Sequence, residues 1–283
     1  MLGLSKVVKR IENERSIDRI AGPIAERVSK ATAPDTIKNL LSGSWLGHQL
    51  HPMVSDIPIG AWSMASALDL LGGKQMRPAA QRLVALGIVS SIPVAVTGAS
   101  DWSESYGKAR RVGTVHAIAN SVGMNFQVLS WVARKKDRHV LGAGLSLIGM
   151  GFTGAAGYLG GHLSFDMGIG VNHTAFEKLS KKWTDVAAED ELQEGQLRRV
   201  TVHETPVVIT RHKGELHAMS ATCAHAGGPL DRGYIENDCI VCPWHQSKFR
   251  LDDGSPARGP AGSGQPVWQV RTQDGRIAVR SAD

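Results

Sequence analysis

The sequence has little cysteine, with only three in 283 residues. Three thiols cannot form the framework of disulfides that stabilises small secreted domains. The first six residues, 1–6, lack the apolar core of a cleavable export signal, and no such signal is evident. Neither feature favours an exported, disulfide-stabilised protein.

Acidic residues are outnumbered by basic ones, which gives a formal net charge of +6 and a pI near 9.3. A basic chain can indicate nucleic-acid binding, but here Lys and Arg do not form one patch with interleaved aromatic residues. Between about residues 53 and 161 they cluster in short segments that separate apolar stretches. That pattern is typical of a membrane protein. We therefore expect a membrane location and no nucleic-acid partner.

Two of the cysteines belong to a metal-binding pattern in the last quarter of the sequence. Cys223-Ala224-His225 is followed by sixteen residues and then by Cys242-Pro243-Trp244-His245. Two thiolates on one iron and two imidazoles on the other hold a [2Fe–2S] cluster. Zinc also binds Cys and His, but its ligands are more often spaced C-x2–4-C and H-x3–5-H. The spacing therefore predicts that Cys223 and Cys242 bind one iron and that His225 and His245 bind the other.

The residues around this pattern resemble the Rieske family. Gly227-Gly228-Pro229-Leu230 follows the first pair, Gln246-Ser247-Lys248-Phe249 follows the second, and Gly259-Pro260-Ala261 comes later. They are similar to the two cluster-binding loops and the proline loop of that family. The resemblance covers about residues 184–283 and implies an electron-transfer domain. Short β-rich runs at 199–202, 207–211 and 278–280 fit a small antiparallel fold.

Particular positions indicate the subtype. Respiratory Rieske proteins carry a further Cys in each loop, and those positions are Gly228 and Trp244 here. The remaining Cys239 is expected as a small buried residue on a strand. Ser247 keeps one hydrogen-bond donor of the high-potential type, but Phe249 stands where the other, a Tyr, would be. We therefore expect a low potential for this family and a resemblance to Rieske-type ferredoxins.

Four weakly polar stretches precede this region, at 53–72, 84–100, 112–133 and 139–161. Each has about the twenty residues that cross a bilayer core as a helix, and short basic turns separate them. A soluble helical bundle is the alternative, because none is strongly hydrophobic and Asp56 and Asp69 interrupt the first. Against it, the stretches lack a charged face at helical spacing. The pattern favours four transmembrane helices.

This half has a resemblance of its own, carried by Gly47-His48-Gln49-Leu50-His51-Pro52, by Gly98-Ala99-Ser100-Asp101-Trp102 and by Gly157-Tyr158-Leu159-Gly160-Gly161-His162-Leu163. It is similar to an uncharacterised family of four-span bacterial membrane proteins, some of which are fused to a Rieske domain. The resemblance covers about residues 40–175. It implies a four-helix membrane bundle in the bacterial inner membrane and brings no established activity.

The expected fold class is therefore α+β multidomain, with a four-helix transmembrane bundle followed by a small all-β Rieske domain. We expect an amphipathic N-terminal segment at 1–45, the membrane domain at 46–175 and the Rieske domain at 184–283. The first segment could lie on the membrane surface, pack on the soluble domain, or be an ordinary solvated helix.

Up-and-down topology puts His51, His116 and His162 at the same end of the bundle, on the side that the Rieske domain follows. Ionisable residues at membrane depth are expensive and often functional. One hypothesis is a cofactor site, with haem b bound by His116 and His162 or with His51 as an alternative ligand. Another is that these side chains cap helix ends and bond to carbonyls. A quinone pocket at the same place is a third.

The first functional hypothesis is a membrane-anchored electron-transfer protein, an oxidoreductase component that exchanges electrons with a redox partner protein or a quinone. The second is a redox-sensing or assembly protein without sustained turnover. An enzyme acting at the histidines is a third option, for which the sequence names no substrate or catalytic residue. Basic residues are balanced across the two sides of the bundle, so the positive-inside rule does not decide orientation. The absence of an evident export signal favours a cytoplasmic Rieske domain.

Overall fold

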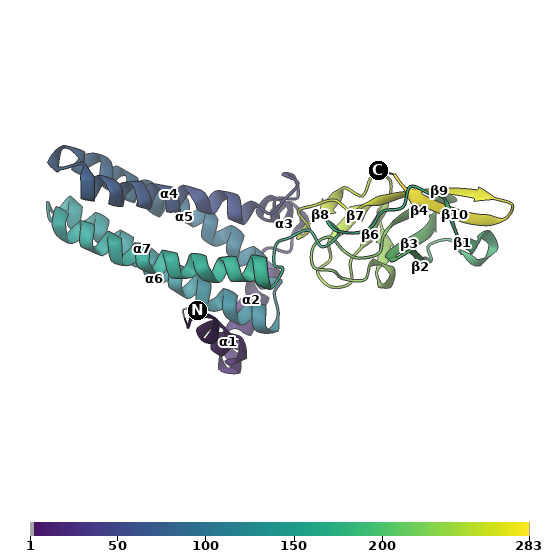
Figure 1. The fold of residues 1–283 in the computed structure, drawn as a ribbon, viewed down its shortest axis with the longest axis horizontal. Helices are drawn as coiled ribbons and strands as arrows, with labels where there is room; N and C mark the ends of the chain where they lie inside the picture. Colours follow the sequence, from purple (N-terminus) through teal and green to yellow (C-terminus); the bar gives the residue numbers. More distant parts are fainter. Residues whose placement is uncertain (1–2, 283) are drawn as a thin grey trace. The chain divides into compact units, whose positions relative to one another are not determined.

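The computed structural model describes residues 3–282, which divide into two compact units (Figure 1). The first unit comprises the chain up to Ala33 together with Leu50–Ile169, and it is helical. The second comprises Pro34–Gln49 together with the chain from Gly170 onward, and it contains all the β-strands of the described residues. A short segment near the N-terminus thus belongs with the β unit, although the residues on both sides of it in sequence belong to the helical unit.

Four long helices form most of the first unit. They are α4 (Leu50–Leu71), α5 (Arg77–Ser103), α6 (Gly107–Lys135) and α7 (His139–Gly161), and a π-helical turn at His162–Asp166 extends the last. The predicted stretches 84–100, 112–133 and 139–161 fall within α5, α6 and α7, and 53–72 exceeds α4 by one residue, so their helical character is confirmed. Each helix exceeds the twenty or so residues that match a bilayer core.

The four long helices lie alongside one another within their unit (Figure 1). Helix α4 packs on α5, α5 on α6, α6 on α7, and α7 back on α4. Small residues allow the closest approach, which is between α6 and α7. A Cβ atom at Gly123 would lie 3.0 Å from the carbonyl oxygen of Gly149, and one at Gly149 would lie 2.9 Å from that of Gly123. Close packing at small residues is how membrane helices commonly associate.

Polar side chains fill much of the space between these helices. The Ser146 hydroxyl donates to Gln127 Oε1 (2.8 Å), and both residues are fully buried. Arg134 is also fully buried, and its Nη1 donates to Asp69 Oδ1 at 2.8 Å. Ser130 accepts from Arg134 Nε (3.2 Å) and donates to the carbonyl of Gly142 (2.6 Å). Of the two acids that interrupt the first stretch, Asp69 is therefore paired inside the bundle, while Asp56 is exposed.

Apolar side chains instead cover the outside of the four long helices. The exposed ones include Met53, Ile57, Ile59, Met64, Leu70, Leu86, Val89, Ile92, Val96, Ile118, Leu129, Val140, Leu141, Leu147 and Ile148. A soluble bundle has the opposite distribution, with its apolar stripe inside. By length and composition alone, two helical segments are apolar enough to cross a membrane: Lys74–Ser103, with a mean hydropathy of 1.8, and His139–Asp166, with 1.5.

Two shorter helices at the N-terminus pack on the same unit: α1 (Leu4–Asn13) and α2 (Asp18–Ala31). Arg111 of α6 fixes them in place. Its Nη2 donates to Asp18 Oδ2 and its Nη1 to the carbonyl of Glu12, both at 2.6 Å. Val8 of α1 and Ala21 and Ala25 of α2 are buried, whereas the amphipathic segment expected over 1–45 stays a prediction.

Two antiparallel sheets make up the β unit. The larger has the strand order β1-β10-β9-β4-β3-β2, with β1 (Thr184–Ala188), β2 (Leu197–Val202), β3 (Thr205–His212), β4 (Glu215–Ser220), β9 (Val267–Gln273) and β10 (Arg276–Ser281). The smaller has the order β5-β6-β7-β8, with β5 (Tyr234–Glu236), β6 (Cys239–Val241), β7 (Lys248–Arg250) and β8 (Pro256–Arg258). The predicted strands lie in β2, β3 and β10, so they are confirmed. Helix α3 (Asp35–Ser42) is the helical part of the Pro34–Gln49 segment.

The buried Arg134–Asp69 pair yields a first prediction. Asp69→Asn leaves the guanidinium of Arg134 without its counter-charge inside the bundle, so we expect a loss of about 3–5 kcal/mol in the free energy of unfolding. Glu26→Gln, which breaks the exposed pair of Glu26 with Lys30, serves as the control and should cost about 0–1 kcal/mol. Thermal unfolding of the detergent-solubilised protein, followed by circular dichroism, measures both. Equal stability of the two variants would contradict the structural role of the pair.

Candidate metal centre

Two loops of the same construction carry the four predicted ligands. In loop 1 (223–228), the Cys223 carbonyl accepts from the N–H of Gly227, and the Cys223 N–H donates to the carbonyl of Gly228, both at 2.8 Å. In loop 2 (242–247), the Cys242 carbonyl accepts from Gln246 (3.1 Å), and the Cys242 N–H donates to Ser247 (2.9 Å). Gly227 and Gln246 occupy equivalent turn positions, and both have positive φ, at 73° and 61°.

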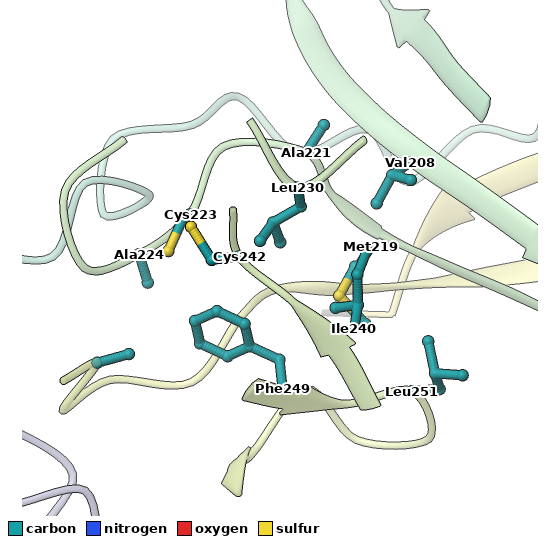
Figure 2. Close-up of a cluster of buried hydrophobic side chains, with 11 residues drawn as sticks. Val208, Met219, Ala221, Cys223, Ala224, Leu230, Ile240, Cys242, Phe249 and Leu251 are labelled. Carbon is teal, nitrogen blue, oxygen red and sulfur yellow. The ribbon is translucent and has the colours of Figure 1, made fainter. Parts of the chain in front are cut away.

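The loops bring the thiols together at one place and the imidazoles at another. Cys223 and Cys242 are each 1% exposed, and Figure 2 shows their sulfur atoms beside each other, with Leu230 and the Phe249 ring close by. The rings of His225 and His245 meet edge to face, with their centroids 4.9 Å apart. Among residues 3–282, no three His, Cys, Asp or Glu side chains are grouped to hold a single ion. Two pairs suit a dinuclear centre better than one tetrahedral zinc.

Backbone N–H groups point at both sulfurs. Those of His225 and Ala226 donate to Cys223, and those of Trp244 and His245 donate to Cys242. Such donors stabilise thiolates and tune the potential of an iron–sulfur cluster. The hydrogen bond from Cys223 to Cys242 raises the pKa of the first thiol and lowers that of the second to about 7.

The His225 side chain is also suited to metal binding. Burial lowers the pKa of His225 to about 3, and the nearby charges of His245, His173 and Lys38 act in the same direction. The imidazole is therefore neutral at physiological pH, which is the form that ligates a metal. Its Nδ1 atom is buried and has no hydrogen-bond partner within the described residues. A buried acceptor without a donor is expensive unless a ligand satisfies it, so this donor set fits an iron–sulfur cluster.

The two positions that carry extra cysteines in respiratory Rieske proteins face each other here. A Cβ atom at Gly228 would lie 2.9 Å from Cys242 Sγ and 3.1 Å from the Trp244 ring. No side chain fits at Gly228, and the indole occupies the neighbouring space. All three cysteines are free. The expected burial of Cys239 on strand β6 is confirmed.

Gln265 and Ser247 support the loops by hydrogen bonds, and sequence reasoning missed the first of them. Gln265 Oε1 accepts from the N–H of Ala224 (3.0 Å), and its Nε2 donates to the carbonyls of Ser220 (2.7 Å) and Thr222 (2.6 Å). Ser247 Oγ accepts from the N–H of Ala261 at 3.1 Å. A hydrogen bond from the Ser247 hydroxyl to a cluster stays a prediction from the sequence. A glutamine in a glycine-rich loop carries no sequence signal of this role.

Phe249 is fully buried beside the two cysteines, and its ring offers no hydroxyl (Figure 2). The structure thus places a hydrocarbon surface where high-potential Rieske proteins have a donor. Trp244 is the opposite case, because 55% of its surface is exposed and its ring meets that of His245 edge to face. Trp244 and its neighbour His245 therefore mark an accessible side of the centre.

The three membrane histidines each bond within the helical unit. The Nδ1–H of His51 donates to the carbonyl of Val94 (3.1 Å), and that of His116 donates to Ala156 (2.8 Å). These bonds join α4 to α5 and α6 to α7. Asn120 donates to Nε2 of His116 at 3.1 Å.

His162 takes a different environment, with its Nε2 3.1 Å from Glu12 Oε1 and its Nδ1 3.5 Å from Asp166 Oδ2. His162 thus lies beside two carboxylates, whereas His116 bonds to a backbone carbonyl and to Asn120.

Comparison with known families identifies both halves of the chain. A family model described as "Rieske [2Fe-2S] domain" matches residues 182–272. A second, described as "Predicted membrane protein (DUF2231)", matches residues 47–173. The two resemblances drawn from the sequence are therefore confirmed.

Curated relatives match the β unit. A human Rieske domain-containing protein is 47% identical over 73 residues, which are 24% of this chain and 46% of that protein, so the chain spans under half of its length. The anthranilate 1,2-dioxygenase ferredoxin subunit of Burkholderia cepacia is 31% identical over 98 residues, which are 35% of this chain and 91% of the subunit. Among solved structures, a complex of reduced oxygenase and oxidized ferredoxin in carbazole 1,9a-dioxygenase matches with 31% identity and a TM-score of 0.34, covering 35% of this chain and 94% of that one.

Ser247→Ala tests the support of the loops. The substitution leaves the buried N–H of Ala261 without its acceptor, so we expect a loss of about 1–3 kcal/mol in the free energy of unfolding of the β unit. Thr201→Ala, at an exposed position on β2, should change it by less than about 0.5 kcal/mol. Denaturant titration followed by tryptophan fluorescence compares them. A Ser247→Ala variant as stable as Thr201→Ala would show that this hydrogen bond does not support the loops.

Proposed function

This chain belongs to the Rieske [2Fe–2S] family, and on that premise we propose that it is a membrane-anchored electron-transfer protein. The observation that carries the proposal is the arrangement of two buried thiols and two imidazoles on facing loops, with backbone N–H groups directed at both sulfurs. Cys223 and Cys242 would bind one iron, and His225 and His245 the other. The cluster supplies one-electron redox chemistry when bound, and the protein supplies its insulation and its exposed edge.

The membrane anchor is the helical unit, which we propose spans the bilayer four times. Two segments meet the hydropathy requirement of a span, and all four long helices combine an apolar exterior with a partly polar interior. That distribution supports contact of α4 and α6 with lipid as well, since in water a polar exterior and an apolar interior would be favoured. The location we propose is the bacterial inner membrane, with the Rieske domain on the cytoplasmic side.

We propose a protein as the redox partner. Relatives that match nearly their full length to this domain are named as ferredoxin components of dioxygenase systems, including the anthranilate 1,2-dioxygenase subunit and a naphthalene 1,2-dioxygenase component. The exposed Trp244 beside His245 offers an accessible edge for such a partner. No described residues point to a quinone, which stays a prediction from the sequence.

Haem b is not part of this proposal. The Nδ1–H groups of His51 and His116 donate to backbone carbonyls of neighbouring helices, and His162 lies beside two carboxylates. These bonds support the interpretation that the histidines tie helix ends together. Two glycines fit this interpretation. A Cβ atom at Gly98 would lie 2.7 Å from the His51 ring, and one at Gly160 would lie 3.2 Å from the His116 ring.

The ligand assignment predicts that His225→Ala and His245→Ala each abolish the Rieske-type electron paramagnetic resonance signal of the reduced protein, because each removes one of two imidazoles on the same iron. His217→Ala is a matched control on strand β4 of the same unit and should keep the signal. Iron and sulfide content of the purified proteins gives an independent measure. A wild-type signal in either ligand variant would refute the assignment.

The four-span topology predicts a pattern of labelling. Single cysteines placed at Arg77 and at Arg138 should react with an impermeant maleimide from the same side of the membrane, and one at Lys108 from the opposite side. The native cysteines are buried, so the unsubstituted chain serves as the blank. Labelling of all three positions from one side would exclude four spans.

A further inference from the structure

The segment Pro34–Gln49 is bound to the β unit by side chains that hydrogen-bond the backbone around loop 3 (259–265). The Asn39 amide donates to the carbonyl of Ala257 (3.0 Å), and its Oδ1 accepts from the N–H of Gly259 (2.8 Å). Gln49 Nε2 donates to the carbonyl of Pro260 at 3.0 Å. Loop 3 follows strand β8, and its Ala261 is the residue that Ser247 of loop 2 holds. The segment therefore contacts the end of the unit where the predicted ligands lie.

Two glycines in loop 3 allow this close contact. A Cβ atom at Gly259 would lie 2.2 Å from Ser42 Oγ, and one at Gly262 would lie 2.8 Å from the carbonyl carbon of His48. Both separations are far below van der Waals contact, so any larger residue would push the segment away. The close contact therefore depends on glycine in loop 3 as well as on the side chains of Pro34–Gln49.

An ion pair connects the segment directly to loop 2. Arg258 Nε donates to Asp35 Oδ1 of α3 at 2.7 Å, while its Nη1 donates to the carbonyl of Gln246 at 3.0 Å. Gln246 follows the predicted ligand His245. One guanidinium thus joins the N-terminal segment to the loop that would hold half of the cluster ligands.

Lys38 lies at the centre of this contact. It is only 1% exposed, although Lys is among the residue types least often buried. Its side chain lies against Gly259, with Cγ 3.4 Å from where a Cβ would be. The charge of Lys38 is also the smallest of four causes that lower the pKa of His225. A buried cation beside a redox centre therefore comes from a part of the chain outside the Rieske fold.

We propose that Pro34–Gln49 is an intramolecular clamp on the cluster-binding end of the β unit, and that Lys38 is a positioning residue that sets the reduction potential of the cluster. The proposal rests on the proposed cluster ligation. Reduction adds one negative charge to the cluster, and a cation held in a low-dielectric environment stabilises that charge more than an exposed one does. The clamp excludes water and fixes the cation, so the reduced form is favoured.

The test is a redox titration of the full-length, cluster-loaded protein, monitored by electron paramagnetic resonance. Lys38→Met keeps the length and the apolar stem of the side chain but removes the charge. We expect the equilibrium constant for reduction to fall roughly tenfold, which corresponds to about 59 mV for one electron. Lys38→Arg keeps the charge and should restore most of the potential. Lys178→Met, at a side chain that is 78% exposed in the same unit, should leave it unchanged.

A wild-type potential in Lys38→Met would overturn the role of Lys38. So would an equal fall in Lys38→Arg and Lys38→Met, because that result assigns the effect to packing instead of charge.

A second measurement tests the clamp if Lys38→Met fails to fold. Asn39→Ala removes both hydrogen bonds to the Ala257–Gly259 backbone, and we expect faster amide hydrogen–deuterium exchange in the peptide covering 257–263. Asn13→Ala, at an exposed side chain on α1, is the control and should leave that exchange unchanged. Unchanged exchange in Asn39→Ala would refute the clamp.

The exchange experiment does not require a redox partner. If the clamp is absent, the wild-type resonance signal persists and only this inference fails. If the wild-type protein shows no Rieske signal, the proposed function fails instead.

Discussion

The proposed cluster site depends on two loops that are held in place by hydrogen bonds from buried side chains. The four predicted ligands lie on these loops, and buried neighbours supply the hydrogen bonds that hold the loops in place. Gln265 satisfies three backbone groups around loop 1, Ser247 ties loop 2 to loop 3, and Arg258 binds the carbonyl beside His245. None of these side chains needs to touch iron. They restrict the loops before a metal binds, so the predicted ligand side chains lose less conformational entropy on binding.

The helical unit differs from the β unit, because large apolar side chains lie on its exterior and polar side chains lie between its helices. If lipid surrounds these helices, as we propose, hydrophobic burial cannot hold them together, and polar contacts and close glycine packing must do so. The structure contains such contacts: Gln127 with Ser146, Arg134 with Asp69, and the close glycine packing of α6 on α7. His51 and His116 belong to the same class, since each bonds a carbonyl on the next helix. Their hydrogen bonds account for two of the conspicuous histidines without a cofactor.

The sequence was informative where chemistry requires fixed local spacing, and uninformative where contacts form between distant residues. The C-x-H and C-x-x-H pattern predicted the two loops, and the apolar stretches predicted four helices, because ligand spacing and helix length are local properties. The contact of Asn39 with Ala257 joins residues 218 positions apart, and no local pattern encodes it. The pattern of apolar residues over 1–45 is compatible with a helix on a membrane, in solution or on another domain, so it does not distinguish these locations. Only the structure separated α3 from α1 and α2. The pairing of His116 with His162 was inferred from topology alone, which places side chains at one end of a bundle but does not set what they face.

The division of the chain has a mechanical consequence for electron transfer. The chain leaves the helical unit after Ala33, contributes Pro34–Gln49 to the β unit, returns at Leu50, and enters the β unit again at Gly170. The two units are therefore joined by three chain crossings instead of one flexible linker. Asn39 binds the backbone of Ala257 and Gly259, and Asp35 binds Arg258, so these contacts attach the segment between the first two crossings to the β unit. The same contacts hold Lys38 beside the ligand loops. In our proposal, the hydrogen bonds that attach Pro34–Gln49 to the β unit are also those that would hold Lys38 in place.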